Sequence, residues 1–400
     1  MAGFAFKQDK PNRIPAGEEP FPLAALIALA LSGFVTILTE ALPAGLLLRI
    51  ADDLSVSRTA VGQTVTIYAI GSLIAAIPLT RATQRLRRRP LLAMTLAGFA
   101  IANLATAFST SYALTMSARL IAGISAGLLW ALLAGYAARM VPDAQKGRAI
   151  AVAMAGTPLA LSIGVPAATF MGTLVGWRTC FVAMSIVALL LLAWVSIKLP
   201  DFPGQASSER VALREVGKIS GVRPILFVTL AFVLAHNILY TYIVPMLQPA
   251  GMVDSVDVVL FVFGCVSVVG IWLVGLFVDR RLLLLAIVSC SLFIAAMAIL
   301  GLLPELRSGV YLAVGIWGLA FGGAATIFQT AMARAAPQQT DVAQSMLVTA
   351  WNLAIAGGGI LGGTMLTQFG SAAFAPAVTA LLMACLAVIA IRRNAFQHSF

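Results

Sequence analysis

Runs of about 20 apolar residues recur along this chain from Phe21 to Ile391, and they constrain its fold more than any other feature. A helix needs about 20 mostly apolar residues to cross the hydrocarbon core of a bilayer. Only 10% of the residues are charged and 60% are hydrophobic, against about 25% charged residues in ordinary soluble domains. The chain is therefore expected to be an all-α, polytopic membrane protein, which excludes a water-soluble globular enzyme.

We predict twelve transmembrane helices. They cover residues 21–48, 59–79, 90–108, 113–140, 149–175, 179–199, 224–245, 258–277, 282–303, 309–333, 342–369 and 372–391. The longest hydrophilic segment divides these spans into six and six. The expected organisation is an N-terminal tail (1–20), a six-helix bundle (21–199), a central loop (200–223), a second six-helix bundle (224–391) and a C-terminal tail (392–400).

The distribution of positive charge predicts the orientation of these helices. The chain has 26 Lys and Arg residues and a net charge of +11. If the N-terminus is cytoplasmic, 21 of the 26 lie in cytoplasmic tails and loops and four on the opposite face. The positive-inside rule then places both termini in the cytoplasm. This distribution accounts for the basic charge, so no nucleic-acid partner is expected. The expected location is the lipid bilayer of a bacterial inner membrane.

An internal repeat is visible when the chain is shifted by 195 residues. Ala138-Arg139 then aligns with Ala333-Arg334, and Gln84-Arg85 aligns with Asp279-Arg280. The shift predicts two pseudo-symmetric bundles with a substrate path between them. The two halves are expected to rock about a central site near the middle of the membrane.

Glu40 is the one acid that the sequence places deep within a predicted span. Placing an ionisable group in hydrocarbon costs at least about 2.5–3.5 kcal/mol, so such a group usually has a function there. We expect Glu40 to exchange a proton with each side of the membrane, in a region where Pro43 and Gly45 break the helix. The alternative is that the span limits are too broad and that Glu40 lies near the outer surface.

Arg119 is the one base within a predicted span, about seven residues from its start. It could extend its side chain to the outer interface. Alternatively, it is the counter-charge of a proton-coupling site, whose contact with Glu40 or with a carbonyl of the first span changes between conformations.

A polar group on the seventh span provides further candidates. An unperturbed histidine has a pKa of about 6.5, so we expect that His236 can also titrate in the working range. The repeat places Glu40 opposite its neighbour Ala235. His236 and Tyr240, like Asn237 and Thr241, are four residues apart and so share a helical face. We expect them to line a substrate cavity, with hydrogen bonding between helices as the alternative. Weaker candidates for the same role are Gln63, Gln329 and Asn352.

Glycine and proline are concentrated in the fifth and eleventh spans. The fifth contains Gly156, Pro158, Gly164 and Pro166, and the eleventh contains residues 357–359 and 362–363, all glycine. Such residues allow close approach and bending of helices. They predict a sliding contact between the halves, although ordinary packing of membrane helices uses the same residues.

Signatures of enzymes and of bound metals are missing from the sequence. The four cysteines lie singly in apolar runs, the two histidines are far apart, and no phosphate-binding loop occurs. We therefore expect no cofactor, metal site or catalytic residues, and any active transport would use an ion gradient.

Several motifs resemble the major facilitator superfamily. Gly275-Leu-Phe-Val-Asp279-Arg280-Arg281 is similar to the second copy of its loop motif. The first copy keeps Arg81 and Arg85 but lacks the aspartate. Arg119-Leu-Ile-Ala-Gly123 resembles its motif in the fourth span. The resemblance implies that these loop residues and the glycines of the fifth span control conformational change.

Within that superfamily, three segments resemble the twelve-span drug:proton antiporter branch, which contains sugar and nucleoside exporters. They are the segments beginning at Thr39-Glu40, Ala235-His236 and Trp351-Asn352. The resemblance implies a monomeric exporter that exchanges a small organic molecule for protons by alternating access. A proton-coupled importer on the same fold and a non-transporting membrane receptor are the alternatives.

Overall fold

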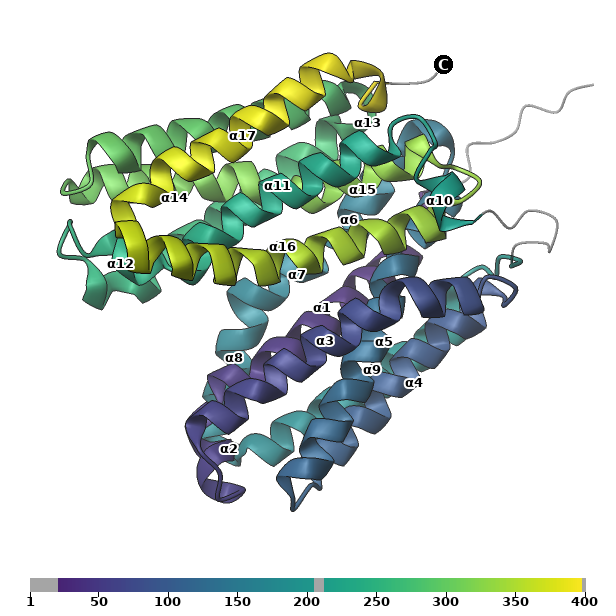
Figure 1. The fold of residues 1–400 in the computed structure, drawn as a ribbon. Coiled ribbons are helices and arrows are strands. Elements are labelled where there is room, and N and C mark those ends of the chain that lie inside the picture. The colour runs from purple at the N-terminus through teal and green to yellow at the C-terminus, as the bar shows by residue number, and fades with distance from the viewer. Residues whose placement is uncertain (1–20, 205–211, 398–400) are drawn as a thin grey trace, which may run out of the picture.

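The computed structural model describes residues 21–204 and 212–397. The predicted N-terminal tail, residues 205–211 of the predicted central loop and the last three residues therefore lie outside the described residues. Within the described ranges, all regular structure is helical (Figure 1). The helices of the first half are α1 (Leu23–Gly45), α2 (Leu47–Asp53), α3 (Arg58–Ala82), α4 (Arg88–Ala107), α5 (Tyr112–Arg139), α6 (Lys146–Met154), α7 (Gly156–Leu159), η2 (Ala160–Gly164), α8 (Val165–Val175) and α9 (Trp177–Lys198). Those that follow are α10 (Leu213–Val216), α11 (Val222–Thr241), α12 (Ile243–Leu247), α13 (Val256–Leu302), α14 (Arg307–Gly322), α15 (Ala324–Ala335), α16 (Thr340–Phe369) and α17 (Phe374–Ile391).

The described residues contain eleven helical segments long and apolar enough to cross a membrane. One of them, α13, has 47 residues, whereas about 20 suffice to cross a bilayer. Arg281 interrupts it with non-helical backbone angles (φ −133°, ψ 32°). Because the sequence predicts one span on each side of this residue, α13 corresponds to the eighth and ninth spans, and the all-α, twelve-span architecture is confirmed.

The fifth predicted span is a broken helix, made of α6, α7, η2 and α8. Its middle segment, η2, is π-helical. Pro158 and Pro166 lie on either side of η2, and neither has the N–H that a regular helix would bond to the carbonyl four residues earlier. The loss of these bonds explains why the helix changes its pitch between the two prolines.

The two halves have separate hydrophobic cores. One core is formed by buried residues between Val216 and Phe396. The other is formed by buried residues between Ala25 and Leu199, joined by only Ile271 and Ala333 from the second half. Each half therefore buries its own apolar side chains.

The 195-residue repeat is visible in the close packing of glycines. In the first half, a methyl group on Gly123 or Gly127 would overlap the backbone of Tyr68 or Ser72. In the second half, Gly318 and Gly322 contact the backbone of Phe263 and Ser267 in the same way. All four contacts correspond under the same shift. The same close crossing of two helices is thus built twice.

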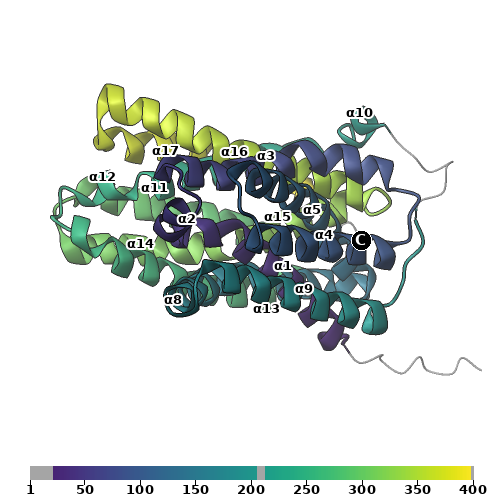
Figure 2. The same ribbon diagram turned by 90° about the horizontal axis from the view of Figure 1, so that it is seen from below.

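The halves meet at one end of the molecule. This basic end contains α10, the end of α17 and the junction of α3 with α4, while α2, α8 and α12 lie toward the opposite end (Figures 1 and 2). The first turns of α16 are almost wholly buried, whereas in its later turns only Ala354, Gly358 and Gly362 are buried. The fifth span follows the same pattern, since α6 is mostly buried and α8 mostly exposed. The halves are therefore closed against each other at the basic end and apart toward the other.

Candidate functional site

Arg119 is buried and joins three helices of the first half. Its side chain is 1% exposed. From α5, its guanidinium donates hydrogen bonds to the carbonyls of Thr39 (2.6 Å) and Glu40 (3.1 Å) on α1 and to that of Thr64 (3.3 Å) on α3. Arg119 thus contacts carbonyls of the first span, one of the two partners that the sequence suggested, and its side chain does not extend to the interface.

Pro43 explains why a carbonyl of α1 is free to accept this bond. In a regular helix, the N–H of residue 43 would bond to the carbonyl of Thr39, but proline has no N–H. The helix also breaks at Leu46, since α1 ends at Gly45 and α2 begins at Leu47. The Thr39 carbonyl therefore has no partner of its own and is satisfied by Arg119.

Two further side chains complete this group. Tyr68 on α3 donates to the carbonyl of Thr36 (3.0 Å), and the Arg119 guanidinium lies 4.9 Å from the centre of its ring. Asn103 on α4 donates to the Thr39 hydroxyl (3.0 Å). Tyr68, Asn103 and Thr39 were not predicted from the sequence to be site residues. The signal for Thr39 was present, because it precedes a proline by four residues.

Glu40 is next to Arg119 in space, but their side chains are not paired. Arg119 bonds to the backbone carbonyl of Glu40. None of the ion pairs in the described part of the chain includes the Glu40 carboxylate. The residue is partly buried. A carboxylate here can gain or lose a proton without first breaking an ion pair.

His236 lies in an aromatic cluster of the second half. Its ring is stacked on Phe321, with centroids 3.5 Å apart, and lies 5.2 Å from Trp317 and 5.3 Å from Tyr240. His236 is 6% exposed, and its Nδ1 atom has no hydrogen-bond partner among the residues that the structure describes. His236 and Tyr240 lie on one helical face, as predicted, but the side chains that contact this face are mainly aromatic.

The other predicted polar candidates do not form one cluster. Asn237 and Asn352 donate to the carbonyls of Val233 and Val348 in their own helices. Gln63 and Thr241 are exposed, and Gln329 is buried on α15. Among the described residues, no hydrogen bond, ion pair or ring contact connects Arg119 and its partners on α1 and α3 with the rings around His236. The structure therefore brings Glu40 and Arg119 together and leaves His236 in the other half.

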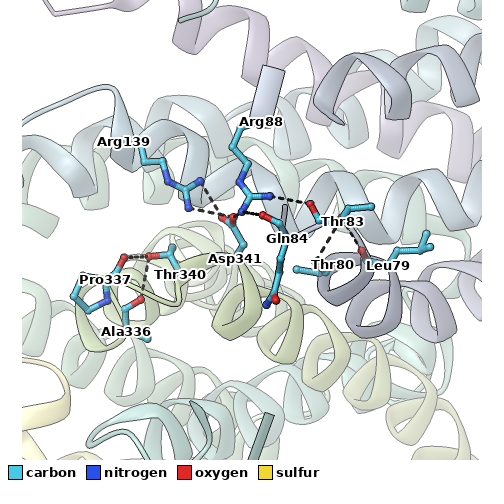
Figure 3. Close-up of polar contacts among 10 residues, drawn as sticks. All are labelled: Leu79, Thr80, Thr83, Gln84, Arg88, Arg139, Ala336, Pro337, Thr340 and Asp341. Carbon is cyan, nitrogen blue, oxygen red and sulfur yellow. Dashed lines mark hydrogen bonds and ion pairs between the residues drawn. The ribbon is translucent and has the colours of Figure 1, made fainter. Parts of the chain in front are cut away.

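An ion cluster joins the two halves at the basic end (Figure 3). Asp341, in the first turn of α16, is paired with Arg88 of α4 (2.8 Å) and Arg139 of α5 (3.0 Å). The side chains of Arg88 and Asp341 are each 1% exposed. Two arginines of the first half thus share one buried carboxylate of the second.

Asp279 makes the corresponding contact at the start of α6. Its carboxylate accepts hydrogen bonds from the backbone N–H groups of Gly147 (2.5 Å) and Arg148 (2.9 Å) and is paired with Arg334 (3.0 Å). Gly275 faces α6 in the same region, since a methyl group there would lie 3.1 Å from Ala151. The Arg81, Arg85 and Arg280 side chains are exposed.

The two contacts are related by the repeat, but their charges are arranged differently. Gln84 occupies the position that corresponds to Asp279, while Arg139 corresponds to Arg334. The acid missing from the first loop is supplied by Asp341 at the start of α16. Both arginines therefore have an acidic partner, although only one loop contains the aspartate.

These features define a helical membrane transporter built from two halves that close against each other at one end. The chain belongs to the Major Facilitator Superfamily, whose family model matches residues 29–359. This is a family of transporters and not of enzymes, which confirms the resemblance found in the sequence.

The chain is similar to three named relatives, two of which are efflux transporters by name. It is 30% identical over 356 residues to the purine ribonucleoside efflux pump NepI of Escherichia coli (strain K12), covering 87% of this chain and 88% of that one. It is 27% identical over 349 residues to a probable sugar efflux transporter of Mannheimia succiniciproducens, with coverage of 87% and 88%. It is 29% identical over 400 residues to the transcription regulatory protein OpdE of Pseudomonas aeruginosa, with coverage of 97% and 98%.

Solved structures share the fold at lower identity. The proton:xylose symporter XylE matches with a TM-score of 0.73 at 16% identity, covering 93% of this chain and 95% of that one. The transporter FucP in its outward conformation matches with a TM-score of 0.74, also at 16% identity, with coverage of 95% and 99%.

Proposed function

We propose that the protein is a proton-coupled secondary transporter that exports a small organic compound by alternating access. The observation that carries this proposal is the buried Arg119 guanidinium, held by the carbonyls of Thr39 and Glu40 beside a carboxylate that has no ion partner. Ionisable groups inside the membrane are costly and mark ion or substrate pathways. Glu40 is the proposed proton carrier, and Arg119 responds to its charge.

The bonds of Arg119 suggest how the proton affects conformation. Loss of the Glu40 proton creates a negative charge beside the guanidinium and attracts it away from the carbonyls of Thr39 and Thr64. Because those carbonyls connect α5 to α1 and α3, this movement loosens the contact among three helices. Substrate binding and proton release are thereby linked through one side chain.

The proposed substrate is a sugar-like, nucleoside-like or drug-like molecule, as the names of two relatives suggest. The aromatic cluster around His236 supports this choice, because sugars and planar bases both pack against aromatic rings. We assign a set of eight residues to substrate binding: Glu40, Gln63, His236, Asn237, Tyr240, Thr241, Gln329 and Asn352. Of these, Glu40 and His236 are also assigned to proton coupling.

The proposed location is a bacterial inner membrane, with both termini in the cytoplasm and the protein acting as a monomer. The excess of basic residues at one end supports this orientation. The closed basic end then faces the cytoplasm, so that the described conformation opens outward. Arg81, Arg85, Gly275, Asp279 and Arg280, with the glycines and prolines of the fifth span, are the proposed elements of the conformational change.

The test uses inside-out vesicles with an acidic interior and a pH-sensitive dye. Sugars, nucleosides and drugs are added one class at a time. Each class is tested on three sets of vesicles, which contain the native protein, the Glu40→Gln variant or the Glu215→Gln variant. We expect one class to release protons from native and Glu215→Gln vesicles, and Glu40→Gln to abolish the release but retain substrate exchange. Unchanged proton release in Glu40→Gln would refute the role of Glu40.

Two other functions predict different results in the same vesicles. An importer releases protons only when substrate is loaded inside, because substrate and proton then leave together. A regulatory membrane protein, as the name of the relative OpdE suggests, binds a ligand but moves neither ligand nor protons.

A further inference from the structure

A cavity of about 830 Å³ opens at the basic end of the second half. It lies between the segment that leads from α10 into α11 and the end of α17 (Figure 1). Its walls are residues 217–221, 223, 224 and 227 on one side and residues 388 and 390–395 on the other. This volume is within the range of small-molecule sites, and no role in transport has been given to it.

Four bases and no acids line the cavity: Lys218, Arg223, Arg392 and Arg393. Lys218 is paired with Glu215 (2.7 Å), and both side chains are about half exposed. The other three bases take part in none of the ion pairs found in residues 21–204 and 212–397. The cavity therefore has an excess of positive charge that the described residues do not neutralise.

The cavity also has an apolar wall on its membrane side. Phe227, in the second turn of α11, is 43% exposed, and Ile391, the last residue of α17, is 76% exposed. Val388 and Ala390 lie beside them. Both helices are membrane spans, so this wall lies where the hydrocarbon core begins. Positive charge beyond an apolar wall matches a molecule with an anionic head and a hydrocarbon tail.

The segment that follows the two bases at the end of α17 is packed against the protein. Phe396 follows them and is completely buried. Gly221 lies against Ala395, where an added methyl group would be 3.4 Å from the alanine Cβ. The segment that carries Arg392 and Arg393 is therefore packed against the start of α11, and both arginines line the same cavity as Arg223.

We propose that this cavity binds an anionic phospholipid of the membrane leaflet at the basic end. The phosphodiester lies among Arg223, Arg392 and Arg393, and an acyl chain follows Phe227 and Ile391. Basic pockets between membrane helices on the cytoplasmic side are suited to such head groups. The site lies within the second half alone, so the lipid stays bound while the halves move.

The test measures lipid binding to the full-length protein by native mass spectrometry in a neutral detergent. The probes are phosphatidylglycerol, zwitterionic phosphatidylethanolamine, glycerol 3-phosphate and inorganic phosphate. The variant Arg392→Gln/Arg393→Gln is compared with Lys198→Gln/Arg214→Gln, which removes the same charge from exposed positions at the same end. Thermal unfolding without lipid identifies variants that fail to fold, and Arg223→Gln then provides a second test.

We expect one tightly bound phosphatidylglycerol and about 30-fold weaker binding in Arg392→Gln/Arg393→Gln, since each interfacial base contributes to the attraction. The control variant should bind as the native protein does. Equal weakening in the control would overturn the site in favour of general charge attraction. Equal binding of phosphatidylethanolamine would overturn selection for an anionic head. Equal binding of glycerol 3-phosphate or inorganic phosphate would assign the cavity to a soluble anion and overturn the lipid proposal.

Discussion

A single proline determines how Arg119 is bound. Pro43 removes the N–H that would otherwise occupy the Thr39 carbonyl, and Arg119 donates to that carbonyl from α5. A buried carbonyl without a donor costs about 1–3 kcal/mol. The proline and the arginine therefore depend on each other, although they are far apart in the sequence.

Replacing Pro43 by alanine should weaken this dependence. The variant restores an N–H four residues after Thr39, which then competes with Arg119 for the carbonyl. We expect proton-coupled transport to fall several-fold while thermal stability stays the same or rises, because proline inside a helix is unfavourable. Pro78→Ala in α3 is the matched control, since Pro78 also lies inside a helix. Equal transport in Pro43→Ala and native vesicles would contradict this account.

Replacing Arg119 by lysine should be nearly as harmful as removing it. The guanidinium reaches three carbonyls on two helices, and an ammonium group cannot reproduce that planar arrangement. We expect transport to fall at least tenfold and the unfolding temperature to fall by several degrees. The exposed Arg49 provides the control Arg49→Lys, which should change neither quantity.

At the level of single residues, the sequence identified the two charges and suggested the first-span carbonyls that Arg119 contacts, but it did not identify Tyr68 and Asn103. Glu40 and Arg119 could be found because charged residues are rare in membrane spans. Tyr68 and Asn103 could not, because hydroxyl and amide side chains are common in such helices and only the fold brings these two to α1. The cluster around His236 was predicted to be more polar than it is, because its rings come from helices distant in sequence.

At the level of helices, hydropathy predicted the number of spans but not their irregularities. The break in the fifth span could be anticipated from Pro158 and Pro166, whereas a π-helical turn between them could not. The boundary at Arg281 was expected as a loop, and the chain turns there within a single residue. A hydropathy profile reports where apolar runs end and does not report the backbone angles of a turn.

The Asp341 cluster should hold three helices together at the basic end. Removing one partner of a buried ion pair costs about 3–5 kcal/mol, because the other charge stays buried alone. Asp341→Asn leaves the buried Arg88 without its acidic partner. We therefore expect the population of the closed conformation to fall and that of a conformation open at the basic end to rise. Spin labels at positions 198 and 397, one in each half, should then report a longer mean distance.

The control for this experiment is Glu215→Gln, which removes a half-exposed ion pair with Lys218. Such pairs contribute about 0–1 kcal/mol, so the distance between the labels should not change. An unchanged distance in Asp341→Asn would mean that other contacts, such as that of Asp279 with α6, keep the end closed.

For the whole molecule, the closed basic end predicts which parts of α16 react with water-soluble reagents. Ser345 is buried near the start of α16, and Ala356 lies three turns further along on a similar face and is exposed. In a variant with the exposed Cys265 replaced by serine, Ala356→Cys should react with an impermeant maleimide in intact cells. Ser345→Cys should not. Reaction of Ser345→Cys in inside-out vesicles would mean that the basic end is open at rest.

The separate cores of the two halves have a mechanical consequence. A force that pulls the chain out of the membrane from one terminus first acts on a half whose apolar contacts are almost all internal. That half can be extracted while the other stays intact, so force–extension curves should contain two main groups of rupture events, one for each half. The molecule would then yield as two units in series, joined mainly by the polar contacts of one end.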